Sequence, residues 1–207
     1  MIIHPPQFAK LEVPREKLLL RLGFAMGRTR SDSQTEAIIN EEIENSKKLI
    51  ESKQVLASSK IVFYGKNKIL LEPVFSIDSS KIFALVKDCA EAYGFAVTIG
   101  PHIEKKRNLL VAAKQTSRAL VLDAIGSVMA EELAEITNNQ IKEIAKAKGV
   151  STTKRFSPGY GDWKIEGQKD FLNWLGADKI GIRLTDAFQM LPEKSISAII
   201  GLGKAVE

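Results

Sequence analysis

The residues best suited to chemistry gather in one stretch, which reads Arg155-Phe156-Ser157-Pro158-Gly159-Tyr160-Gly161-Asp162-Trp163. Proline fixes φ and glycine admits dihedral angles closed to other residues, so the stretch predicts a shaped loop rather than a helix or a strand. The guanidinium of Arg155 can hold a carboxylate or a phosphate by two parallel hydrogen bonds, and the rings of Tyr160 and Trp163 can face a ring or a cation. We therefore expect a small ligand with an anionic end and an aromatic or cationic body. The alternative is a structural turn, in which Arg155 pairs with an acid and the rings fill the core.

The rest of the sequence lacks the groups on which most catalysis depends. No G-x-G-x-x-G motif lies between a strand and a helix, and Gly201-Leu202-Gly203 comes too close to residue 207 to open one, which argues against a Rossmann-type methyltransferase. The single cysteine, Cys89, excludes an internal disulfide and any multi-cysteine zinc or iron–sulfur site. Neither His4 nor His102 has an acid or a cysteine at ligand spacing, and nothing supports a catalytic triad. The sequence predicts binding, with no catalytic residue and no metal site.

Length and composition fit one compact unit. The chain has 207 residues, of which 44% are hydrophobic, and we expect residues 1–207 to form one unit with an extended segment over residues 1–12. No run reaches the roughly eighteen apolar residues of a membrane span, and the first residues lack the charged and apolar regions of a signal peptide. We therefore expect a cytoplasmic protein that does not bind a membrane.

A loose basic cluster lies after the middle of the chain and accounts for part of the net charge of +5. Its members are Lys142, Lys146, Lys148, Lys154 and Arg155. Such a cluster could meet nucleic acid or an acidic protein, but it has neither interleaved aromatic residues nor a known reader module. We interpret it as the solvated surface of a helix and expect no nucleic-acid partner.

Helical and strand patterns alternate along the chain and predict an α+β fold. Ser33-x-x-Glu36 is a candidate capping box, Gly94 a candidate helix end, and Gly100-Pro101 a candidate helix start. The expected helices cover residues 14–25, 33–50, 80–93, the stretch after 101, 117–148 and 166–175, with a polar link at 27–33. The expected strands cover residues 59–64, 68–71, 95–99, 180–184 and 195–202, with a hairpin turn at 65–67.

The long helix at 117–148 carries a polar stripe beside its apolar face. Asp123, Ser127 and Glu131 follow one another at four-residue steps, which places them on one line along the helix. The stripe is either the ordinary solvent margin of an amphipathic helix or a brace that hydrogen-bonds to the Arg155 loop.

The strand at 195–202 alternates between two faces. Ile196, Ala198, Ile200 and Leu202 point one way, while Ser195, Ser197, Ile199 and Gly201 point the other. Gly201 and Gly203 leave backbone uncovered, which either permits close approach by a flat ring or merely ends the strand.

An ordered series of short motifs covers the region from Arg155 to Gly203. It comprises Arg155-x-x-Pro158-Gly159-Tyr160, Gln168, Ile180-Gly181-x-x-Leu184-Thr185 and Met190-x-Pro192-x-x-Ser195-x-Ser197. A weaker stretch precedes it, with Thr98-Ile99-Gly100-Pro101, Leu122-Asp123-Ala124-Ile125-Gly126-Ser127 and Glu131. Together these motifs resemble the activation domain of vitamin B12-dependent methionine synthase in a short, stand-alone form. The resemblance implies a bent, mostly antiparallel sheet packed with several helices, one of them long and central.

The resemblance also implies a function in reactivation. Domains of this family bind S-adenosylmethionine and present its methyl group to cobalamin, after flavodoxin or another donor has supplied an electron. This sequence lacks the D-x-H-x-x-G motif that ligates cobalamin, so the corrinoid is expected only on a partner, a cobalamin-binding methionine synthase module. The chain would then act in trans in methionine biosynthesis. The alternative is a ligand-sensing or scaffold protein of a corrinoid methyl-transfer pathway that drives no methyl transfer.

Matching motif positions imply the residues that hold S-adenosylmethionine. Arg155 would bind the carboxylate, Ser157 would contribute backbone contacts, and Tyr160 would pack against the ligand or hydrogen-bond to it. Pro158 and Gly159 would shape the loop, and Ile200 and Gly201 would approach the adenosyl group.

Two acidic ligand positions of the family have no counterpart here. Glu12 is the only acid ahead of the first expected helix, and residues 149–154 contain none. Glu131 and Asp162 are the candidates to take their place.

Overall fold

An antiparallel sheet forms the centre of the protein in a computed structural model that describes residues 2–7, 11–24, 32–64, 67–72 and 75–203. Seven strands of the described residues make this sheet, and they follow the order β4-β3-β2-β5-β9-β6, with β1 also beside β2. Their bounds are β1 Ile2–Gln7, β2 Lys53–Tyr64, β3 Lys68–Leu71, β4 Phe75–Asp78, β5 Cys89–Thr98, β6 Ser151–Thr152 and β9 Ser195–Gly203. A separate hairpin pairs β7, Arg183–Leu184, with β8, Met190–Leu191. The expected α+β class with an antiparallel sheet is confirmed.

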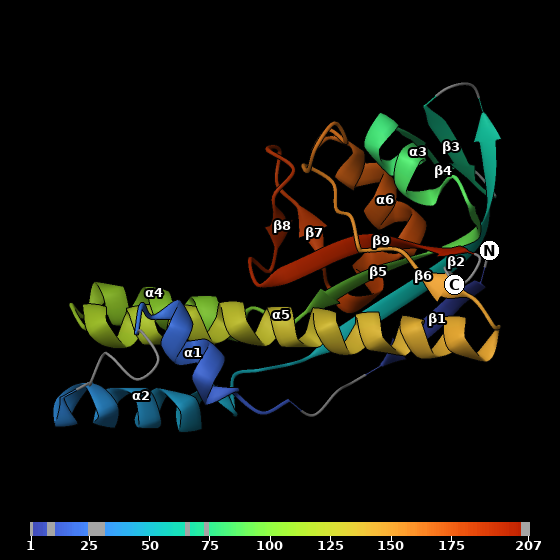
Figure 1. The fold of residues 1–207 in the computed structure, drawn as a ribbon. Helices are drawn as coiled ribbons and strands as arrows, with labels where there is room; N and C mark the ends of the chain where they lie inside the picture. The colour runs from blue at the N-terminus through green and yellow to red at the C-terminus, as the bar shows by residue number, and fades with distance from the viewer. Residues whose placement is uncertain (1, 8–10, 25–31, 65–66, 73–74, 204–207) are drawn as a thin grey trace.

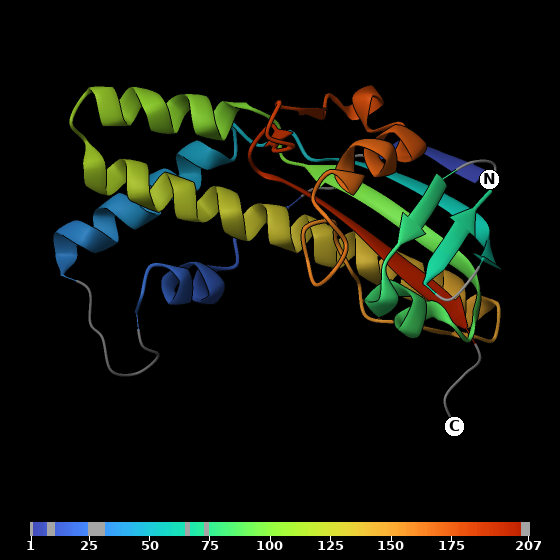
Figure 2. The ribbon, with the colours of Figure 1, turned by 90° about the horizontal axis from the view of Figure 1, so that it is seen from above.

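Helices cover both faces of the sheet (Figure 1). Their bounds are α1 Arg15–Arg21, α2 Ser33–Ser46, α3 Ser80–Val86, α4 His102–Ala112, α5 Thr116–Ala147 and α6 Gly167–Leu175, with a 3-10 turn at Ala177–Ile180. The long helix α5 runs along one face and extends beyond the sheet, where α1, α2 and α4 pack against it (Figures 1 and 2). Helices α3 and α6 lie on the opposite face. The single long central helix, expected at residues 117–148, is confirmed within one residue at each end.

Each face of the sheet has its own hydrophobic core. Ala198, Ile200 and Leu202 of β9 pack toward α5, while Ile199 packs toward α6. This alternation is the one predicted from the sequence, and it arises because successive side chains of a strand point to opposite faces. Strand β9 therefore connects both layers, and its N-terminal end lies beside the loop that follows α5.

One expected helix is wrong. The helix predicted at residues 80–93 ends as α3 at Val86, and Cys89 to Tyr93 begin strand β5. Gly94 does not cap a helix but pairs with Ala57 and Ile199 in the middle of the sheet. A Cβ at Gly94 would lie 2.9 Å from a ring carbon of Phe171 and closer still to Trp174. The glycine is needed because α6 packs directly on the strand at this point.

The capping box is also wrong, by one residue. Asp32, not Ser33, caps α2 by accepting a 2.7 Å hydrogen bond from the backbone N–H of Thr35. Glu36 instead pairs with Arg15 of α1. The hydrogen bond from Thr35 lowers the pKa of the Asp32 carboxyl. Asp32 rather than Ser33 therefore occupies the N-cap position, and the two residue types have similar preferences for it.

The remaining differences concern element lengths. Strand β2 begins at Lys53 rather than at residue 59, and α2 ends at Ser46 rather than at residue 50. Helix α1 is shorter than the expected 14–25, and only Arg183–Leu184 of the expected strand at 180–184 is a strand. Ile2–Gln7 of the expected N-terminal segment pairs with β2. The predicted link at 27–31 and turn residues 65–66 lie outside the described residues.

The described residues include neither a membrane-spanning helix nor a cluster of metal ligands. No helix among them combines the length and the apolar character required to cross a bilayer. No group of three or more histidine, cysteine, aspartate or glutamate side chains in that part of the chain is arranged to hold a metal ion.

Candidate ligand-binding site

A cavity of about 480 Å³ lies between the loop that begins at Arg155, the start of β9 and the side of α5. Its lining residues are Glu131, Arg155, Phe156, Ser157, Pro158, Tyr160, Gln168, Met190, Ser195, Ile196 and Ser197. This volume falls within the range of roughly 300–1,000 Å³ that small-molecule sites occupy. The predicted loop residues Arg155, Ser157, Pro158 and Tyr160 therefore meet at one cavity, and Gly159 lies in the turn between them.

Backbone hydrogen bonds give the loop a fixed shape. Phe156 exchanges two hydrogen bonds with Ile199 of β9, at 2.9 and 2.8 Å. Gly159 donates from its N–H to the carbonyl of Trp163 at 2.8 Å, and its φ of +87° lies in the left-handed region that favours glycine. The hydroxyl of Ser157 donates to the carbonyl of Ser197 at 2.7 Å. The shaped loop predicted from Pro158 and Gly159 is confirmed.

The two aromatic residues of the loop have different surroundings. Tyr160 stands at the rim of the cavity and is 69% exposed. Trp163 is buried, with its ring 5.3 Å from that of Phe171 and 6.5 Å from that of Phe75. The prediction that Trp163 offers a face to the ligand is wrong, because this ring belongs to the core between the loop and α6.

Asp162 braces the loop from outside the cavity. Its carboxylate accepts hydrogen bonds from the hydroxyls of Ser79 and Ser80 and, at 2.8 Å, from the backbone N–H of Ser80. The hydroxyl of Ser79 and then that of Ser80 hold the pKa of Asp162 well below its usual range. Asp162 therefore ties the loop to the start of α3 and is not available to hold a ligand, which leaves Glu131 as the acid at the cavity.

One terminal nitrogen of the Arg155 guanidinium has a partner and the other does not. Its Nη2 forms an ion pair with Glu131 of α5, so the expected pairing with an acid is present. Its Nη1 is buried and has no hydrogen-bond partner. The buried hydroxyl of Ser197, which also lines the cavity, likewise has none. Buried polar atoms are rarely left unpaired, because each such atom costs roughly 1–3 kcal/mol. Two residues that line the cavity therefore each carry an unpaired buried polar atom.

Ile200 and Gly201 do not reach this cavity. Ile200 is fully buried in the core on the α5 side of the sheet. Gly201 is covered, because a Cβ there would lie 2.7 Å from Cys89 Sγ and 3.0 Å from Val86 Cγ1. The expectation that Gly201 leaves backbone open to a flat ring is therefore wrong. A Cβ added at Gly203 would likewise lie 2.8 Å from the carbonyl oxygen of Asp88 and 3.0 Å from Cys89 Sγ.

The site residues that were not predicted come from four separate elements. Phe156, Gln168, Met190, Ser195, Ile196 and Ser197 line the cavity. Gln168 of α6 is buried, and its side chain donates to the carbonyl of Phe188 at 2.7 Å, which fixes the loop before β8. The hydroxyl of Ser195 bonds to Thr98 at 2.9 Å. Most of these residues belong to the motif series quoted above, which was the available signal.

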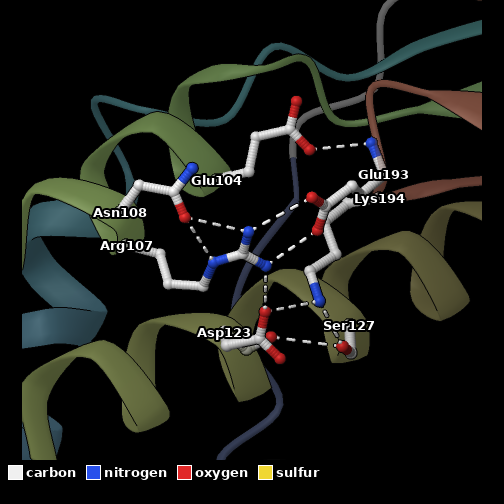
Figure 3. Close-up of polar contacts among 7 residues, drawn as sticks. All are labelled: Glu104, Arg107, Asn108, Asp123, Ser127, Glu193 and Lys194. Atoms are coloured by element: carbon white, nitrogen blue, oxygen red, sulfur yellow. Dashed lines mark hydrogen bonds and ion pairs between the residues drawn. The ribbon is translucent and has the colours of Figure 1, made fainter. Parts of the chain in front are cut away.

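The polar stripe of α5 makes two different connections. Glu131 contacts the Arg155 loop, as the brace hypothesis predicts. Asp123 and Ser127 instead hold Lys194, which immediately precedes β9 (Figure 3). Burial opposes ionisation of Asp123, but the hydrogen bonds from Lys194 and Arg107 outweigh it and lower the pKa of this carboxyl. The prediction that all three residues brace the same loop is therefore wrong for Asp123 and Ser127.

Besides Arg155, which pairs with Glu131, two further members of the basic cluster have acidic partners in the fold. Lys148 pairs with Glu91 and lies 5.5 Å from the ring centre of Tyr93. Lys142 lies 3.5 Å from Glu135. These contacts agree with the interpretation of the cluster as helix surface.

The fold and the cavity together define a class: an α+β domain with a ligand-sized cavity between a shaped loop, the start of a strand and a long helix. Residues 82–206, more than half of the chain, match the family described as vitamin B12 dependent methionine synthase, activation domain. The chain belongs to this family.

A solved structure has the same fold. The crystal structure of the MetH reactivation domain bound to AdoHcy is similar to this chain, with a TM-score of 0.71 and 13% sequence identity. The similarity covers 98% of this chain and 80% of that one. No curated protein matches the chain.

Proposed function

We propose that this chain binds S-adenosylmethionine in the cavity beside Arg155 and supports the reductive methylation of cobalamin on a separate B12-dependent methionine synthase. The observation that carries the proposal is the unpaired Nη1 of Arg155, buried in the wall of a ligand-sized cavity. The AdoHcy bound to the MetH reactivation domain is S-adenosylhomocysteine, the product that remains when S-adenosylmethionine gives up its methyl group.

The amino-acid end of the ligand fits the charges at the cavity. The Nη1 of Arg155 would donate to the ligand carboxylate, and the hydroxyl of Ser197 would donate beside it. Charge-assisted hydrogen bonds of this kind contribute about 1.5–3 kcal/mol each. Glu131, which already fixes Nη2, would face the ligand ammonium.

The remaining contacts come from the loop and the strand start. Ser157 would offer backbone groups, Pro158 and Gly159 would set the corner, and Tyr160 would pack on the ligand from the rim. Ser195 to Ser197, rather than Ile200 and Gly201, would supply the contacts from β9.

The residues at the cavity bind and orient, and the reaction requires nothing more of them. Bound S-adenosylmethionine supplies an electrophilic methyl group on a positively charged sulfur, and its acceptor is the cobalt of the partner's cobalamin. An exposed rim at Tyr160 leaves a side on which a partner can approach. The electron would come from flavodoxin or another donor, also outside this chain.

The test is a reconstituted methyl transfer. A methionine synthase module carrying oxidised cobalamin is mixed with an electron donor, methyl-labelled S-adenosylmethionine and this chain. We expect label on cobalamin only when the chain is present, a strong loss with Arg155→Ala, and no change with the distant surface variant Lys68→Ala. Binding of S-adenosylmethionine without any transfer would instead support a ligand-sensing or scaffold protein.

A further inference from the structure

We propose that Lys194 is a positioning residue of the ligand site, through which one polar stripe of α5 sets the distance between the two walls of the cavity. The inference rests on the proposed function, because the ligand is the molecule that both walls must fit. One wall is the Arg155 loop and the other is the start of β9, at Ser195 to Ser197. Asp123, Ser127 and Glu131 form the stripe.

The charged end of Lys194 is held by two residues of α5. Its Nζ lies 2.8 Å from Asp123 Oδ1 and 2.9 Å from Ser127 Oγ, and its side chain is 13% exposed (Figure 3). The aliphatic stem crosses α5 at Gly126, where an added Cβ would lie 3.2 Å from Cγ and Cε of the lysine. Such an enclosed ammonium has one well-defined position, which fixes the backbone at residue 194.

The same turn is held from α4. Arg107 donates to Glu193 at 2.8 and 3.2 Å and to Asp123 at 2.9 Å. Glu104 accepts from the backbone N–H of Glu193 at 2.8 Å (Figure 3). Two cations, Arg107 and Lys194, therefore meet three carboxylates where β9 begins, and one of these, Glu104, is held by a backbone N–H.

The position of this turn contributes to the position of a cavity wall, together with the pairing of β9 with β5. Ser195 follows Lys194 directly, and Ser197, with its unpaired hydroxyl, comes two residues later on the same face of β9. Glu131 of the same α5 stripe holds Arg155 in the opposite wall. The carboxylates of Asp123 and Glu131 are eight residues apart, about 12 Å along a rigid helix. Helix α5 therefore contacts both walls, the one that carries Arg155 Nη1 and the one that carries Ser197 Oγ.

A suitable variant removes the link and keeps the fold. Lys194→Met retains the aliphatic stem that packs beside Gly126, and Asp123 keeps Arg107 as its cationic partner, so no buried charge is left uncompensated. Lys194→Arg restores a cation. Lys17→Met is the matched control, because Lys17 also pairs with α5, at Glu132, but contacts neither wall.

The experiment has two readouts. Calorimetric titration with S-adenosylhomocysteine, well below the unfolding temperature, should show affinity weakened roughly tenfold in Lys194→Met, largely recovered in Lys194→Arg and unchanged in Lys17→Met. Crystal structures of the ligand-free variants should show Ser195 to Ser197 displaced from Arg155 in Lys194→Met only.

The outcomes separate this inference from the proposed function. Wild-type affinity in Lys194→Met would overturn the positioning role, whatever its melting temperature. If the wild-type protein binds no S-adenosylhomocysteine, the proposed function fails, and the crystal structures alone decide: an unmoved Ser197 overturns the inference, and a displaced one supports it.

Discussion

Arg155 combines two roles in a single planar group. The ion pair with Glu131 orients the guanidinium and leaves Nη1 unpaired in a residue that lines the cavity, so the side chain would lose little freedom when a ligand binds. A lysine could not reproduce this arrangement, because its single nitrogen lacks the two separate, coplanar donor groups of a guanidinium. The local sequence predicted the arginine and its loop, since these residues are contiguous. It could not predict Ser197, whose hydroxyl becomes significant only when β9 is placed beside the loop.

Asp162 gives the protein an acid-sensitive contact. Because its folded-state pKa is lowered by Ser79 and Ser80, its stabilising effect is fully present above about pH 5 and is lost as the pH falls below about 4 toward the lowered value. Asp162→Asn should lower the melting temperature at pH 7 and flatten its decline between pH 5 and pH 3. Melting curves across this range check the prediction, and an unchanged slope would contradict it.

At the scale of elements, the loop depends on one glycine dihedral. Gly159 has a φ of +87°, and a Cβ there would lie 3.1 Å from Ile165 Cδ1. Gly159→Val should abolish binding of S-adenosylhomocysteine while the far-ultraviolet circular dichroism spectrum stays native, since the loop can distort without emptying a core.

Gly149→Val is the matched control for the loop. Gly149 also has a positive φ, of +69°, but its added Cβ would meet nothing within 4 Å and the residue does not line the cavity. This control should lose some stability and keep its affinity. A Gly159→Val protein that binds as the wild type does would refute the dependence on loop shape.

The close packing of helix α6 on strand β5 leaves no room for a side chain at Gly94. Gly94→Ala should destabilise the protein by about 1–3 kcal/mol, because the new methyl group collides with Trp174 and Phe171 in a packed core. Urea unfolding measures the change. Adding Trp174→Phe, which shrinks the opposing ring, should recover part of the loss, and no recovery would point to the strand backbone instead.

The same region shows why some elements could not be predicted. Residues 80–93 contain several helix formers, above all alanine and lysine, and a glycine follows them, so local preference favours one helix. The chain breaks after Val86 because β2 and β9 both pair with the next residues. Tertiary pairing of this kind leaves no local signal. The helices at α5 and α6 were predicted well because their apolar periodicity is strong and their partners agree with it.

At the scale of the whole molecule, the cavity lies where the long helix α5, the loop that begins at Arg155 and the start of strand β9 meet. Four of its residues are neighbours in sequence and were predicted together, whereas Gln168, Met190 and Ser197 come from distant elements. The motif series marked these distant residues, but only the fold shows that they meet. It also shows that β9 presents its start, not Ile200 and Gly201, to the cavity.

In the proposed function the partner, and not this chain, binds cobalamin, which can be tested on the whole protein. The purified protein should show no cobalamin absorbance, since the sequence has no corrinoid-ligating motif. Mixed with a cobalamin-loaded methionine synthase module, it should give a faster-sedimenting species whose cobalamin absorbance co-migrates with it. Stoichiometric cobalamin on this chain alone would overturn the proposed division.

The central claim is that Arg155 binds the carboxylate of S-adenosylmethionine, and two ligands test it most directly. S-adenosylhomocysteine carries the amino-acid end, and 5′-methylthioadenosine lacks it. Calorimetry should show that Arg155→Ala weakens S-adenosylhomocysteine by about 1.5–3 kcal/mol, that Arg155→Lys gives an intermediate loss, and that neither changes the affinity for 5′-methylthioadenosine. Equal losses for the two ligands, or no loss for S-adenosylhomocysteine, would contradict the assignment of Arg155.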